Sequence, residues 1–99
     1  MTNIAQLQDA VDAAHAAHQA AEDKFNAACV DLRQAQDAAN RSRSQKARAH
    51  LRDMQDHHLD AADEARAAWD AYCTAFEALE EAQRLAALPP EPEQLALGL

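Results

Sequence analysis

Glycine, proline and β-branched residues are scarce in this sequence. Its 99 residues include one glycine and three prolines, and all four follow Leu88. Residues 1–88 therefore contain neither of the strong turn-forming residues. The β-branched residues are few: Thr2, Ile4, Val11, Val30 and Thr74. Because sheets need turns and favour β-branched side chains, these shortages exclude a strand-rich fold.

Several functional signals are also missing. No apolar run approaches the roughly 18 residues that suggest a membrane span, and the first residues lack the charged-then-apolar pattern of a signal peptide. We therefore expect a cytoplasmic protein with no membrane segment, in which Cys29 and Cys73 are reduced thiols. The sequence has no glycine-rich nucleotide-binding loop and no nucleophile with an evident base. We expect a protein that is not an enzyme and needs no cofactor.

Alanine dominates what is present. It supplies 27 of the 48 apolar residues, and only four residues are aromatic. Long runs of Ala, Gln, Glu, Asp and Arg are typical of helices. The apolar content is therefore mostly methyl groups on helices.

Apolar positions recur in alternating steps of three and four along two segments. Ten of the eleven positions in the first stripe are apolar: Ile4, Leu7, Val11, Ala14, His18, Ala21, Phe25, Ala28, Leu32, Ala35 and Ala39. The second stripe comprises Ala47, Leu51, Met54, His58, Ala61, Ala65, Ala68, Tyr72, Ala75, Leu79, Ala82 and Ala86. Both have the a and d spacing of a coiled coil, and we call them together the seam.

The two stripes predict one domain, an all-α antiparallel helical hairpin. Its arms cover about 3–40 and 45–88, with a turn near 41–44 in which Ser42 or Ser44 is the N-cap of the second arm. If the chain reverses near residue 43, the numbers of facing residues add to about 86, which brings a positions opposite d positions. Alanine at every seventh position in both arms lets the helices approach closely.

A hairpin with an alanine seam buries little area, which favours self-association. Trp69 and Phe76 are seven residues apart and share one stripe beside Tyr72. We expect these three side chains to form the interface of a homodimer, an antiparallel four-helix bundle. The alternative is that they cover the flank of their own hairpin.

Charge is distributed unevenly around a net value of -8. Residues 41–52 carry five basic side chains and no acidic one: Arg41, Arg43, Lys46, Arg48 and Arg52. We call this group the basic turn. Clustered arginines could contact a nucleic-acid backbone. The alternative is a solvated turn attracted to the acidic arms.

The five histidines suggest a metal site only weakly. His15 and His18 have helical i, i+3 spacing, and the hairpin register would bring His57 and His58 near Cys29. No CxxC or HExxH pattern supplies a fourth ligand, so we expect no metal site. His18 and His58 are interpreted as seam residues that help to fix the register.

The composition changes after Leu88. Residues 89–93 read Pro-Pro-Glu-Pro-Glu, which cannot continue a helix and predicts an extended tether. The last six residues, 94–99, contain three leucines. Because the tether separates them from the helical stripes, we do not expect them to belong to the core. They are typical of a peptide ligand, because leucines exposed on a tether favour burial by a partner.

This hexapeptide resembles the bacterial sliding-clamp-binding motif, Gln-Leu-x-Leu-x-Leu. Gln94, Leu95, Leu97 and Leu99 match it, and Gly98 also matches the Gln-Leu-Val-Leu-Gly-Leu tail of the translesion DNA polymerase IV, from which only Ala96 differs. The resemblance implies that the peptide docks in an apolar pocket of the clamp, the beta subunit of DNA polymerase III. Gln94 would then occupy a polar subsite, Leu97 and Leu99 an apolar one, and Leu95 would pack beside them.

The expected function is therefore a non-enzymatic replication adaptor or inhibitor that binds the sliding clamp. Two alternatives stay open. One is a structural or assembly coiled coil of a phage or mobile element, and the other is a nucleic-acid-binding hairpin that uses the basic turn.

Overall fold

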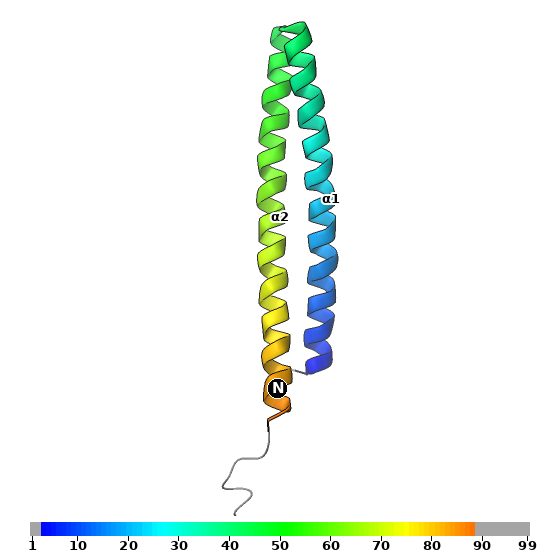
Figure 1. The fold of residues 1–99 in the computed structure, drawn as a ribbon, viewed down its shortest axis with the longest axis vertical. Coiled ribbons are helices and arrows are strands. Elements are labelled where there is room, and N and C mark those ends of the chain that lie inside the picture. The colour runs from blue at the N-terminus through cyan, green and yellow to red at the C-terminus, as the bar shows by residue number, and fades with distance from the viewer. Residues whose placement is uncertain (1–2, 89–99) are drawn as a thin grey trace, which may run out of the picture.

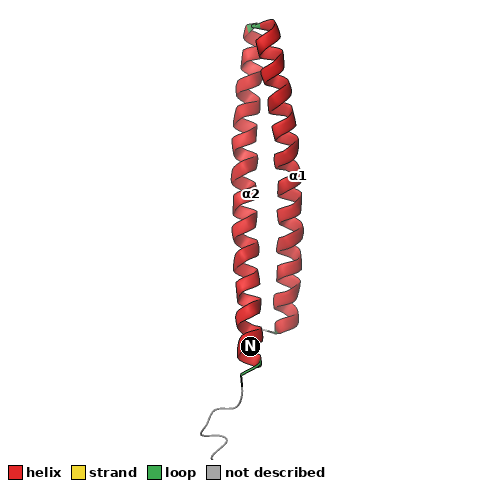
Figure 2. Cartoon of the chain, viewed as in Figure 1, coloured by secondary structure: helices red, strands yellow, loops and turns green. Residues whose placement is uncertain are grey.

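A computed structural model describes residues 3–88 as two long helices that run antiparallel (Figure 1). Helix α1 spans Ile4–Ser42 and helix α2 spans Gln45–Ala86. No strand occurs within the described range (Figure 2). The expected all-α hairpin is confirmed. The expected tether at 89–93 and the peptide at 94–99 lie outside the described residues.

Two residues reverse the chain between the helices. Arg43 adopts a left-handed conformation, with φ of 54°, and its N–H donates to the carbonyl of Ala39 at 2.9 Å. Ser44 is the N-cap of α2, and its Oγ accepts from the N–H of Ala47 at 3.0 Å. Of the two serines that the sequence offered as caps, the structure uses Ser44, while Ser42 ends α1.

The start of α1 is capped in the same way. The Asn3 side chain accepts from the N–H of Ala5 at 2.9 Å, which satisfies one of the amide groups that a helix leaves free at its N-terminus. Each helix of the hairpin therefore begins at a polar cap, and neither needs glycine or proline to define its start.

The core is a narrow line of small side chains between the helices. Seven of residues 3–88 are buried, and all belong to the predicted seam: Val11, Ala21, Ala28, Ala35, Ala39, Ala61 and Leu79. Ala28 and Ala35, which are 0% and 1% exposed, are the most enclosed. The methyl groups of the heptad alanines thus form the contact that holds the two helices together.

Contacts between the helices report their register. His18 packs on Trp69, Phe25 packs on His58, and Lys24 pairs with Glu64. The residue numbers of these pairs add to 87, 83 and 88, close to the value expected for a reversal at residue 43. With a rise of about 1.5 Å per residue, α2 makes the hairpin about 60 Å long.

Candidate binding surfaces of the hairpin

An apolar and aromatic surface runs along α2 beside the seam. We call it the aromatic face, and its members are Leu59, Ala62, Trp69, Cys73 and Phe76. They occupy two neighbouring heptad stripes on one side of the helix. Leu59, Trp69 and Phe76 are 60%, 50% and 42% exposed, and Ala62 and Cys73 are half-buried. This face therefore combines large apolar side chains with access to solvent.

Rings stack along the aromatic face and across to α1. Tyr72 stacks with Trp69 and Phe76, at ring-centroid distances of 5.7 Å and 6.1 Å. From α1, His18 packs on Trp69 at 5.1 Å and His15 packs on Tyr72 at 5.6 Å. These ring contacts hold one side of Trp69 and of Phe76 against the hairpin. The opposite sides of Trp69 and Phe76 remain free for a further contact.

A shallow groove between the helices continues the aromatic face. His18, Glu22 and Phe25 of α1 line it opposite Ala62, Arg66 and Trp69 of α2. The His18 Nε2 lies 3.3 Å from a carboxylate oxygen of Glu22, one turn along the same helix. The groove floor is apolar, and Glu22 and Arg66 place opposite charges at its rim.

The other flank of the hairpin is polar. Lys24 of α1 reaches across to Glu64 of α2, with Nζ 3.1 Å from Oε1. His57 and Asp60 border the same hollow. Because the pair joins exposed side chains, its contribution to stability is small, about 0–1 kcal/mol. In this stretch of the hairpin the two flanks therefore differ in kind, with aromatic rings on one and an ion pair on the other.

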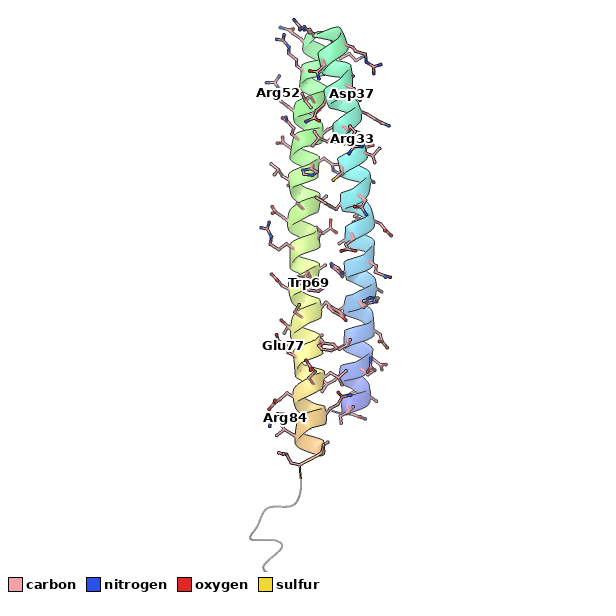
Figure 3. All side chains as sticks on the ribbon, viewed as in Figure 1. Arg33, Asp37, Arg52, Trp69, Glu77 and Arg84 are labelled. Atoms are coloured by element: carbon pink, nitrogen blue, oxygen red, sulfur yellow. The ribbon has the colours of Figure 1, made fainter. Side chains whose placement is uncertain are left out.

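The basic turn occupies the closed end of the hairpin, and all five of its basic side chains are exposed. Figure 3 labels Arg52 near this end, with Arg33 and Asp37 on the adjoining part of α1. Arg41 donates from Nε to the backbone carbonyl of Asp37 at 3.4 Å. Four ion pairs occur within residues 3–88, and none involves the basic turn. Its positive charge is thus available to an anionic partner.

The opposite, open end of the hairpin is acidic. Glu81 and Arg84 form an ion pair there at 2.7 Å. A hydrogen bond and charge attraction from Arg84 lower the pKa of Glu81 below its usual value. Glu77 and Glu80 lie on the same stretch of α2. Positive charge therefore gathers at the turn, while acidic side chains extend along both helices to the open end.

The histidines and cysteines do not assemble into a ligand set in the part of the chain that the structure describes. No group of three or more His, Cys, Asp or Glu side chains there could hold a metal ion. His58 packs against the ring of Phe25, and Cys29 and Cys73 are half-buried free thiols. Neither helix in this part has a stretch long and apolar enough to cross a bilayer.

The structure also brings together residues that the sequence interpretation had treated separately. His15 and His18 were considered as metal ligands or register residues, yet they belong to the aromatic stack with Trp69 and Tyr72. Facing numbers that add to about 86 put His18 opposite residue 68 and His15 opposite residue 71, next to Trp69 and Tyr72, so this signal was present in the sequence. The peptide residues Gln94, Leu95, Leu97 and Leu99 lie outside the described residues.

Comparisons with protein-family models, with curated proteins and with solved structures each found no match to this chain.

Proposed function

We propose that this protein is a non-enzymatic adaptor or inhibitor that docks on the bacterial DNA sliding clamp. The observation that carries the proposal is the hexapeptide at 94–99, in which Gln94, Leu95, Leu97 and Leu99 match the clamp-binding motif. Peptide ligands of this kind bind through a few anchoring side chains in a preformed pocket. The three leucines supply the apolar anchors and the glutamine supplies the polar one.

The arrangement of the hairpin is compatible with this role. Helix α2 ends at Ala86, at the open end of the hairpin, and the hexapeptide follows eight residues later in the sequence. The basic turn lies at the other end, about 60 Å away by helix length. The peptide is thus attached to one end of a rod whose other surfaces are available for a second partner.

Binding of the peptide in the clamp pocket could serve either of two roles. An inhibitor would exclude polymerases that use the same pocket, and an adaptor would bring a partner bound to the hairpin. The aromatic face and the basic turn are the two surfaces that could hold such a partner.

The test is a binding titration of a purified bacterial sliding clamp with the intact chain. We expect that ending the chain at Glu93, or replacing Leu97 and Leu99 with alanine, weakens binding at least about 30-fold, because apolar anchors commonly contribute 2 kcal/mol or more. The control is Leu88→Ala, which removes an exposed leucine outside the motif.

A synthetic peptide of residues 94–99 should displace the intact chain from the clamp. Equal clamp binding by the intact chain and the chain ending at Glu93 would contradict the proposal. So would equal losses from Leu88→Ala and from the two motif substitutions.

A second candidate, nucleic-acid binding by the basic turn, is favoured by one specific observation. Its five basic side chains are exposed, and none takes part in an ion pair within residues 3–88. The structural or assembly coiled coil of a phage or mobile element is the third candidate. It would use the aromatic face to bind a partner helix.

A further inference from the structure

The two heptad stripes that contain the aromatic face change charge along α2. One of its heptad stripes on α2 reads Arg52, Leu59, Arg66, Cys73 and Glu80. The neighbouring stripe reads Arg48, Gln55, Ala62, Trp69, Phe76 and Gln83. These stripes are therefore basic toward the turn, apolar in the middle except for Arg66, and acidic at Glu80 toward the open end. A surface with this order is complementary to itself after reversal.

We propose that the aromatic face binds a second copy of this chain in antiparallel orientation, with α2 packed on α2 and the basic turn of each copy beside the open end of the other. This inference concerns the helical body and does not depend on clamp binding. It specifies the orientation and the register of the expected homodimer.

The register follows from charge and size together. If Arg52 lies opposite Glu80 of the second copy, the numbers of facing α2 residues add to 132. Within one residue of that value, Trp69 faces Ala62 of the second copy and Leu59 faces its Cys73. A large side chain thus meets a small one at both contacts, as close packing requires.

The length of the helix supports the same register. Helix α2 runs from Gln45 to Ala86, so full overlap of two antiparallel copies makes facing numbers add to 131. Charge pairing, side-chain size and maximal overlap therefore agree within one residue. In this register both ends of one hairpin are level with the ends of the other. The whole length of α2 then lies beside α2 of the second copy.

The twofold axis in this register passes close to Arg66. Two guanidinium groups meet there, and each has an acid available, because Glu22 lines the same groove in its own chain. In the isolated hairpin Arg66 has only a loose pair with Asp63, at 4.0 Å between exposed side chains. The two Arg66 and two Glu22 side chains together form a neutral set at the centre of the interface.

The parallel arrangement of two copies is disfavoured by the same charges. It would place Arg48 and Arg52 against the same residues of the second copy at one end, and Glu80 against Glu80 at the other. Like charges at an interface oppose association. The antiparallel arrangement replaces the repulsions at the two ends with Arg52–Glu80 attractions, while Arg66 lies opposite its own copy in both arrangements.

Sedimentation of the full chain is the first test. We expect a species of twice the 10.8 kDa chain mass at tens of micromolar. Trp69→Ala should raise the dissociation constant about 30-fold or more, because a central aromatic residue is removed from both halves. Val30→Ala is the control, since Val30 is 52% exposed on α1 and outside the aromatic face. A monomer at that concentration would overturn the proposal.

Cross-linking tests the orientation and register. In a background with Cys29→Ser and Cys73→Ser, one chain carries Arg48→Cys and another carries Gln83→Cys. These positions face each other across the proposed interface, but lie about 50 Å apart along one helix. Oxidation should join the two different chains and leave either chain alone unlinked. Rapid linkage of two Arg48→Cys chains would indicate a parallel dimer and contradict the proposal.

Charge reversal provides an independent check on the same pairs. Arg52→Glu or Glu80→Arg alone should weaken association about fivefold or more, because each change affects two symmetry-related pairs. Both changes in one chain should restore most of the affinity. Helicity measured by circular dichroism confirms that each variant is folded. Failure of the double variant to recover, with helicity intact, would contradict the pairing of Arg52 with Glu80.

Discussion

At the residue scale, the chain reversal depends on two polar residues in place of a glycine turn. Arg43 takes a left-handed conformation, which costs a non-glycine residue about 1 kcal/mol, and Ser44 begins α2 with a side-chain cap. The sequence offered Ser42 and Ser44 equally. Ser44 becomes the cap because the left-handed Arg43 precedes it, while Ser42 still belongs to α1.

The cap gives a direct prediction. Ser44→Ala should lower the free energy of unfolding by about 1 kcal/mol, because the N–H of Ala47 loses its acceptor. Urea denaturation followed by circular dichroism measures the change. Ser42→Ala is the matched control, since Ser42 is an exposed residue at the end of α1, and it should change stability by less than about 0.5 kcal/mol. Equal effects at the two serines would contradict the assignment of the cap.

At the element scale, the helices are held together by methyl groups. Ala21, Ala28 and Ala35 recur every seventh residue of α1 and are at most 4% exposed. The small side chains bring the backbones close, but each buries little apolar area. Stability of the hairpin therefore depends on the fit of many small contacts along its length. A single enlarged side chain in this line forces the helices apart.

Enlarging a seam alanine tests this view. Ala28→Leu should destabilise the hairpin by about 1–3 kcal/mol, because no space exists for the added atoms. Ala16→Leu, at an exposed position of the same helix, should leave stability nearly unchanged. Thermal unfolding of the two variants gives the comparison. Equal stability of both variants would show that the seam is not closely packed.

At the scale of the whole molecule, positive charge is concentrated at one end of the rod. The basic turn lies at one end, and Glu77, Glu80 and Glu81 lie near the other. A uniform net charge of -8 would repel nucleic acid, but the local field at the turn is positive. The proposed antiparallel dimer would pair Arg52 near this end with Glu80 near the other. Nucleic acid and a second copy would thus be attracted by overlapping sets of charges.

The nucleic-acid candidate predicts a steep dependence on salt. If all five basic side chains contact phosphates, the logarithm of the DNA association constant should fall with a slope of about -4.5 against the logarithm of salt concentration. Replacing the five with glutamine should remove most binding, as measured by fluorescence anisotropy. The control is a double variant, Arg66→Gln and Arg84→Gln, which removes two basic side chains outside the basic turn and should leave DNA binding largely unchanged. Binding that survives the five replacements would exclude the turn as the contact site.

The sequence determined the helical hairpin, its turn and its seam. Local spacing is sufficient for this, because apolar residues every three and four positions can be buried together only on one side of a helix. All seven buried residues belong to the two predicted stripes. The proposal of clamp binding also depends on the sequence alone, because the motif that residues 94–99 resemble is contained in six consecutive positions.

Only the tertiary structure decided how the flanks of the hairpin differ. It joined His15 and His18 to the rings of Trp69 and Tyr72 on one flank, and paired Lys24 with Glu64 on the other. Heptad spacing locates a residue on a helix, but contacts at the edge of a seam also depend on side-chain rotamers and on the distance between helices. Those quantities are set when the two helices pack together, and they place the aromatic rings on one flank of the rod and the Lys24–Glu64 pair on the other.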